Sequence, residues 1–153
     1  DVAFDTLVTL PPFVMLPANH ALSERDTLSL SDFESAAMVL LDLPISRAYF
    51  LSVLQSLNVR PNVTERTADM SVVRSLVANG YGFSLVNMRT RSELAPDGEK
   101  LSFVRLKDDI APLVLGLATK QVEHRSHIVE AFYKHVQQLV ENDGLPGVVM
   151  PTN

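Results

Sequence analysis

The sequence contains no cysteine, and this absence excludes several kinds of protein at once. A chain without thiols has no disulfide framework, no cysteine nucleophile and no thiolate metal site. The lack of cysteine also fits a reducing compartment, so we expect a cytoplasmic protein.

Long apolar runs and basic clusters are missing too. No stretch reaches the ~18 apolar residues of a membrane span, and the N-terminus lacks the basic and apolar regions of a signal peptide. The 13 Lys and Arg residues are scattered through a chain whose formal net charge is −5. Because such a surface does not attract a phosphate backbone, we predict no membrane insertion and no nucleic-acid binding by this segment.

Signatures of catalysis and of metal binding are also lacking. No serine lies in a Gly-x-Ser-x-Gly elbow, and no His–Asp pair is recognisable. His124 and His127 stand beside Glu123 and Glu130, but no further ligand set accompanies them, and a charged helix start is the favoured explanation. We therefore predict no enzyme activity, no metal site and no cofactor.

What the chain does contain is enough apolar sequence for one ordinary core. It has 153 residues, of which 46% are hydrophobic, a composition typical of a globular domain. It starts without Met, in the middle of a pattern, so we expect a piece of a longer protein.

The stretch from residue 64 to residue 87 organises the rest. Apolar residues recur at helical spacing over 70–79, which predicts a helix with one buried face. Asp69 or Thr67 can cap its start, and Gly80 supplies the left-handed residue that ends it. A short apolar run with β-forming residues follows and indicates a buried strand.

The two glycines of this turn, Gly80 and Gly82, match part of a dinucleotide fingerprint. That fingerprint requires a strand before the glycines and a helix after them, whereas here the order is reversed. Leu85 also stands where the third glycine would be. The glycines are therefore expected to shape the turn, and we exclude nucleotide binding.

Further strands and helices alternate along the chain. Helices are expected at 29–35, 47–57, 70–79 and 127–141, and strands at 13–16, 37–41, 60–65, 82–86, 101–106 and 113–118. This order predicts an α/β fold in which a mixed, mostly parallel sheet is flanked by helices. Pro61 suits an edge strand, and the strand at 101–106 is also expected at an edge.

Two further helices also have an expected N-cap. Ser46 is the expected N-cap of the helix at 47–57, and Ser126 that of the last helix. The inner face of the last helix is expected to consist of Ile128, Val129, Phe132, Val136, Leu139 and Val140.

Ligands of such sheets bind outside the carboxyl ends of the strands. Three loops lie there: 42–47, 65–69 and the segment from Asn87 onward. Ser46 and Arg47 offer a hydroxyl and a guanidinium at a helix start, which suits a carboxylate or another small anion. A plain N-cap beside a solvated arginine explains these two residues equally well.

Thr67 and Asp69 stand at a second helix start, with the same ambiguity. A carboxylate opposes an anionic ligand, so Asp69 is favoured as a cap or as a partner for hydrogen-bond donors. Asn87 directly follows a strand end and is a candidate ligand contact.

Three stretches occur in a recognisable order: PFVMLPANHAL at 12–22, TLSLSDF ahead of MVL within 27–40, and SLVANGYGFSL at 75–85. Together they resemble the C-terminal effector-binding region of LysR-type transcriptional regulators. The first is similar to the family's strand and His-Pro-Leu turn, with Ala21 where proline is common. The second resembles its short helix before a strand, and the third its Leu-Val-x-x-Gly-x-Gly turn.

The resemblance implies two Rossmann-like subdomains joined by crossing strands, as in periplasmic binding proteins, with a small effector between them. On this mapping residues 1–11 end the first subdomain and cross over, 12–113 form the second, 114–142 return to the first, and 143–153 are a loose tail. The start of the first subdomain and the DNA-binding helix-turn-helix would precede the chain. The last helix would then lack much of its packing partner.

The resemblance also places effector contacts in two loops of the second subdomain. These contacts match Pro44, Ser46, Arg47, Thr67, Ala68 and Asp69, in agreement with the strand-end argument, which adds Asn87. The expected effector is a small carboxylate or aromatic acid.

The function implied is that of an effector-sensing domain of a bacterial transcription regulator, which assembles as a homodimer or tetramer. The effector would change the angle between the subdomains and so reposition the DNA-binding domains. A periplasmic-type solute-binding protein and a small α/β enzyme are alternatives from other classes. The missing signal peptide counts against the former, and the missing catalytic residues count against the latter.

Overall fold

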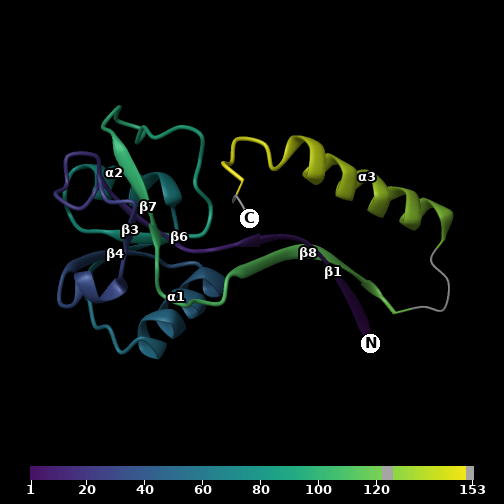
Figure 1. Cartoon of the computed structure of the whole chain (residues 1–153), viewed down its shortest axis with the longest axis horizontal. Helices are drawn as coiled ribbons and strands as arrows, with labels where there is room; N and C mark the ends of the chain where they lie inside the picture. Colours follow the sequence, from purple (N-terminus) through teal and green to yellow (C-terminus); the bar gives the residue numbers. More distant parts are fainter. Residues whose placement is uncertain (122–125, 151–153) are drawn as a thin grey trace.

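The computed structural model describes residues 1–121 and 126–150, which form a rounded body and an arm that extends from it (Figure 1). The arm consists of β1 (Val2–Leu10), β8 (Leu113–Lys120) and α3 (His127–Asp143). Glu123 and His124, considered above for a metal site, lie outside the described residues.

The body contains the strands and helices between β1 and β8. In chain order they are β2 (Phe13–Pro17), β3 (Thr27–Leu28), the 3-10 helix η1 (Leu30–Phe33), β4 (Ala37–Leu41), α1 (Pro44–Ser56), β5 (Asn62–Thr67), α2 (Met70–Ala78), β6 (Ser84–Val86) and β7 (Leu101–Leu106).

The strands of the body form one mixed sheet. β2 pairs antiparallel with β6 and β7, β3 runs parallel to β7, and β4 runs parallel to β5. A parallel bridge joins β4 to Phe83, the residue just before β6: Val39 N–H donates to the Phe83 carbonyl at 2.8 Å, and Phe83 N–H donates to the Ala37 carbonyl at 3.0 Å. The resulting order is β3-β7-β2-β6-β4-β5.

Five of these six strands point the same way, and β2 alone is reversed. The expectation of a mixed, mostly parallel sheet is therefore confirmed. β5 lies at an edge, as Pro61 suggested. The expectation for 101–106 was wrong, since β7 has β2 on one side and the two-residue strand β3 on the other.

The core lies on both faces of this sheet, because successive residues of a strand point to opposite sides. Val14 of β2 packs in one cluster with Phe50 of α1. Its neighbour Met15 packs in a second cluster with Val73 of α2. β2 is buried along its whole length, which explains its continuous apolar sequence.

Helix α1 starts earlier than the sequence suggested. Its first residue is Pro44, and Leu43 at the N-cap makes no side-chain capping bond. The prediction of Ser46 as the cap was wrong. Proline favours the first helical position because its fixed φ suits the helix and its missing N–H would have no partner there.

Helix α2 and its following turn agree with the sequence. The Asp69 carboxylate accepts the Ser71 N–H at 2.7 Å, and the Thr67 hydroxyl accepts the Asp69 N–H at 3.1 Å. Gly80 has a φ of 83°. A Cβ on Gly82 would lie 2.5 Å from the Ala37 carbonyl oxygen, so this glycine lets the turn approach β4 closely.

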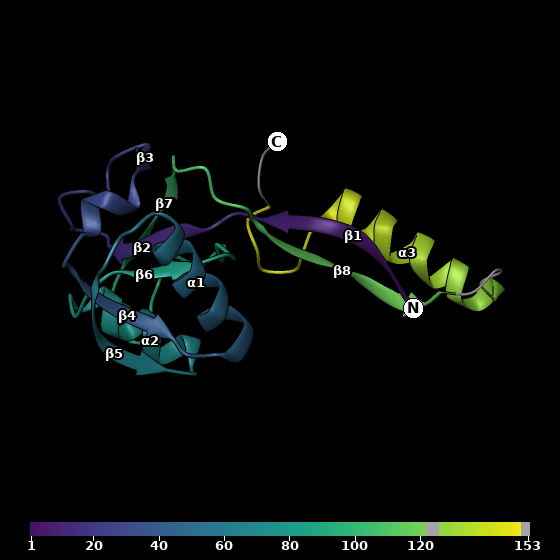
Figure 2. The same ribbon diagram turned by 90° about the horizontal axis from the view of Figure 1, so that it is seen from below.

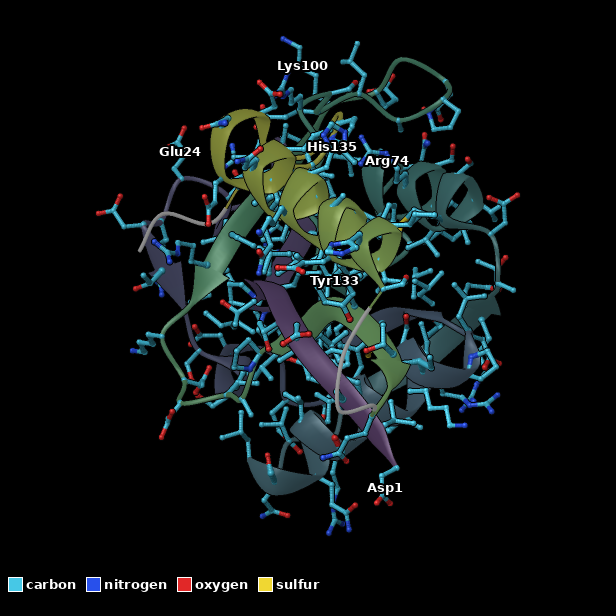
Figure 3. All side chains as sticks on the ribbon, turned by 90° about the vertical axis from the view of Figure 1, so that its right-hand side faces the viewer. Asp1, Glu24, Arg74, Lys100, Tyr133 and His135 are labelled. Atoms are coloured by element: carbon cyan, nitrogen blue, oxygen red, sulfur yellow. The ribbon has the colours of Figure 1, made fainter. Side chains whose placement is uncertain are left out.

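The arm is a two-stranded antiparallel ribbon with α3 along one side (Figure 2). Ser126 caps α3 by accepting the Val129 N–H, as predicted, and Gly144 follows its last residue with a φ of 68°. Tyr133 is buried on the ribbon side of α3, where its hydroxyl donates to Thr119 Oγ1 at 3.4 Å (Figure 3).

The expected inner face of α3 is covered only in part by the described residues, since Val129, Val136 and Val140 are half-buried. Ile128 is 82% exposed and Phe132 is 55% exposed. Val2 and Phe4 of β1 are exposed as well. The prediction that this apolar face packs inward therefore holds in part for the three half-buried valines and was wrong for Ile128, Phe132 and Leu139. The arm presents apolar surface on both the helix and the ribbon.

The segment after α3 is attached to the body rather than loose. Arg91 N–H donates to the Gly147 carbonyl at 2.9 Å, and Val149 N–H donates to the Arg89 carbonyl at 2.8 Å. The expectation of a loose tail therefore fails for residues 147–149. Among the described residues, no helix is long and apolar enough to cross a membrane.

Candidate functional site

A cavity of about 290 Å³ lies where the body meets the arm. β4, β5 and β6 point the same way, so their carboxyl ends meet at one edge of the sheet. Leu41 and Val86, the last residues of β4 and β6, line the cavity at this edge. Leu10 and Leu113 line it from the arm. The site therefore lies at the edge where sheets of this kind bind ligands.

The walls of the cavity are mostly apolar. They are formed from several elements by Leu10, Met15, Leu41, Phe50, Val86 and Phe103, together with Met70, Met88, Leu113 and Leu115. Four polar side chains interrupt this lining: Ser46, Arg74, Asn87 and Thr90. An apolar cavity with a few placed polar groups is the usual form of a small-molecule site.

Arg74 supplies the only charge among the cavity-lining residues that the structure describes. Its guanidinium donates to Thr90 Oγ1 at 2.9 Å and to the carbonyls of Ser92 and Leu94, each at 2.8 Å. It also stands over the Phe103 ring, 5.6 Å from the ring centroid. Burial lowers the pKa of Arg74, because removal from water disfavours the charged form.

Asn87 and Tyr49 bind the backbone of both segments that join the body to the arm. The Asn87 amide donates to the Leu10 carbonyl at 2.9 Å, and the Tyr49 hydroxyl donates to the Ala111 carbonyl at 3.0 Å. Burial raises the pKa of Tyr49, and a hydrogen bond with Asn87 acts in the opposite direction. These two side chains hold the ends of the crossing strands at the rim of the site.

The predicted site residues lie at the expected edge, but only Ser46 and Asn87 line the cavity. Arg47 pairs with Asp42, with 2.6 Å between Nη1 and Oδ1, and its side chain is 45% exposed. Pro44 begins α1 and is exposed. Thr67 is the last residue of β5, and Ala68 and Asp69 link it to α2, where Asp69 caps the helix.

The other cavity-lining residues were not named from sequence, and among them are Met70, Arg74 and Thr90. Met70 and Arg74 are four residues apart in α2, so they share one face of the helix. This face could have been identified from the sequence, because the arginine interrupts a helical stripe that otherwise carries methionine and valine. Thr90 lies in an irregular loop, and no periodic pattern pointed to it.

A larger hollow of about 490 Å³ lies over α2, and its lining includes Val72, Leu76, Asn79 and Tyr81. It includes no residue from the strand ends and no charged side chain. We therefore place the candidate site at the junction of body and arm. Within the described ranges, no group of three or more His, Cys, Asp or Glu residues could hold a metal ion.

Comparison with known proteins gives a consistent result. Residues 1–141 match the family model described as the LysR substrate binding domain. None of the curated proteins compared with the chain matches it. Among solved structures, HinK, a LysR family transcriptional regulator from Pseudomonas aeruginosa, is 28% identical. The match covers 90% of this chain and 48% of that one, with a TM-score of 0.82.

Two further structures are similar. The C-terminal domain of a probable LysR family regulator from Rhodococcus sp. RHA1 is 28% identical, with a TM-score of 0.79; the match covers 88% of this chain and 67% of that one. The BenM effector binding domain with its effector benzoate is 19% identical, with a TM-score of 0.73, and shares the fold over 99% of this chain and 70% of that one. The chain spans about half the length of the first solved relatives it matches.

Proposed function

The chain belongs to the LysR substrate-binding domain family, since the family model matches residues 1–141 of 153, and we propose that it senses a small effector for a bacterial transcription regulator. The observation that carries this proposal is the cavity between body and arm, because a ligand there touches both parts. BenM, which shares the fold, binds benzoate in its own domain.

The proposed mechanism is a change in the angle between body and arm. Leu10 and Leu113, where the crossing strands meet the body, line the cavity. Asn87 lines it too and binds the Leu10 carbonyl. A ligand that fits one arrangement better than another shifts the equilibrium toward it by its difference in affinity. Ser46 and Asn87 are the proposed effector contacts among the residues named from sequence.

The remaining contacts named from sequence stay predictions. Pro44 and Arg47 lie in the first turn of α1, Thr67, Ala68 and Asp69 lie where β5 leads into α2, and none of them lines the cavity. Each of them is testable by substitution with alanine, apart from Ala68, for which serine is suitable.

The arm supports the proposed division into subdomains. In that division residues 12–113 form one subdomain, and residues 1–11 and 114–142 belong to the other. The exposed Val2, Phe4 and Ile128 would pack against the remainder of the first subdomain in the full-length protein. DNA binding would come from a helix-turn-helix outside this chain, in a cytoplasmic homodimer or tetramer without enzyme activity.

A thermal-shift screen of the full-length protein against carboxylates, amino acids, aromatic acids and sugars tests the proposal. A ligand at ~100 times its dissociation constant should stabilise the fold by ~2.7 kcal/mol. The same ligand should change the affinity of the protein for its operator DNA. Stabilisation without any change in DNA binding would contradict the sensor function and favour a solute-binding protein.

A further inference from the structure

Arg74 is a cation that lacks an anionic partner within the part of the chain that the structure describes. Its three acceptors, the Thr90 hydroxyl and the carbonyls of Ser92 and Leu94, are all neutral. A partly buried charge with neutral partners is incompletely compensated for the hydration it has lost. An anion bound at the guanidinium would therefore stabilise the site.

The acidic residues near this edge of the sheet are engaged elsewhere. Asp42 pairs with Arg47 at 2.6 Å, and Glu93 pairs with Arg89 at 2.7 Å. Asp69 accepts the Ser71 N–H at the start of α2. An anion for Arg74 would therefore come from a bound molecule rather than from these side chains.

The guanidinium of Arg74 is held in a fixed orientation. Three hydrogen bonds and the ring of Phe103 position it. A guanidinium has five N–H groups, so these bonds leave two of them for a ligand. Nη2 donates both of its N–H groups to the two carbonyls, so the free groups are the Nε–H and one Nη1–H, which lie on different edges of the guanidinium. A carboxylate can accept either of them in a charge-assisted hydrogen bond, which is stronger than a bond to a neutral acceptor.

The cavity limits the rest of the ligand. Its volume of about 290 Å³ corresponds to roughly ten water-sized groups at ~30 Å³ each. Phe50, Leu41 and Leu113 offer apolar contacts away from the charge. A compact apolar body with one carboxylate matches both the size and the lining.

We propose that Arg74 binds the carboxylate of the effector, so that the sensor selects small monocarboxylates with an apolar body. This inference rests on the proposed function, because it assigns the charge and the anchoring residue of the ligand in that same cavity. It replaces Arg47, which is exposed and paired with Asp42, as the arginine that recognises the anion.

The test uses full-length protein and matched pairs of an acid and its neutral amide: benzoate with benzamide, and cyclohexanecarboxylate with its carboxamide. Isothermal titration calorimetry should show that the wild type prefers the acids. Arg74→Gln should weaken binding of the acids by about 10- to 100-fold and weaken binding of the amides much less. Arg74→Lys should be intermediate, because lysine keeps the charge but lacks the planar guanidinium that the hydrogen bonds to the loop hold in place.

Arg105→Gln is the control, since Arg105 is an exposed arginine of β7 that does not line the cavity. It should leave both affinities unchanged. Equal weakening of acid and amide by Arg74→Gln would mean that Arg74 only orders its loop, and would overturn the inference. Loss of acid preference in Arg47→Gln with retention in Arg74→Gln would overturn it as well.

Failure of this inference and failure of the proposed function give different results. If acids and amides bind the wild type equally well, the sensor function stands and the role of Arg74 is refuted. If no member of either pair binds the wild type and no ligand of the wider screen does, the sensor function itself is refuted.

Discussion

The body and the arm use similar apolar side chains with opposite outcomes. Phe50 of α1 is 1% exposed, whereas Phe132 of α3 is 55% exposed. Both phenylalanines lie on an apolar stripe of an amphipathic helix. α1 packs against one face of the body sheet, and α2 covers the other face. α3 packs only against the two-stranded ribbon of the described chain. Apolar periodicity thus identifies the face that will be covered, but not which part of a protein covers it.

The largest expected effect tests this contrast directly. Phe50→Ala should lower the free energy of unfolding by about 3–5 kcal/mol, because it removes a buried ring and leaves a cavity. Phe132→Ala should change it by no more than about 0.5 kcal/mol, since the ring is largely exposed. Urea unfolding of the 153-residue chain measures both. Equal losses would show that the arm is covered in solution, for instance by a second copy.

A smaller loss of stability is expected when the helix cap of either region is removed. Asp69→Ala should lower the free energy of unfolding by about 1 kcal/mol, because the carboxylate accepts the Ser71 N–H at 2.7 Å. Ser126→Ala should cost less, since its bond to the Val129 N–H is 3.4 Å long. Hydrogen exchange at the amides of Ser71 and Val129 reads out each helix start separately. A greater loss of protection at Val129 than at Ser71 would contradict this ranking.

The smallest effect concerns Tyr49, which stands at the junction of the two regions. Burial raises its pKa above the ordinary value of 10.0 in the folded chain. Above pH 10 the unfolded chain releases this proton first, so the stability that Tyr49 contributes is complete below pH 10 and is lost as pH rises through the folded-state pKa. Tyr49→Phe should therefore flatten the alkaline decline of stability in urea unfolding. An identical decline in both proteins would contradict this cause.

Most of the body could be predicted from sequence, because its signals are local. Helix α2, its Asp69 cap and the turn at Gly80 follow from helical spacing and from the conformations that single residues favour. The position of β7 inside the sheet was not predictable in this way. Its second neighbour is the two-residue strand β3, which has no pattern long enough to recognise.

The site was predicted only as a location. The carboxyl ends of the strands led to Ser46 and Asn87, which do line the cavity. The choice between Arg47 and Arg74 depends on which arginine has an acidic neighbour and which points into the cavity. Both are properties of three-dimensional packing, and the partner of Arg47, Asp42, was visible in sequence only as one residue of a turn.

The pairing of residues 89–91 with residues 147–149 has a mechanical consequence. Two strands alone form a narrow ribbon, about whose axis the arm could twist as well as bend. The backbone bonds from Arg91 to Gly147 and from Val149 to Arg89 add a third attachment, which opposes torsion and leaves bending as the softer motion. The hydroxyl of Thr90, in the same loop, accepts from Arg74. We therefore expect a ligand at Arg74 to alter the torsional stiffness of the connection as well as its angle.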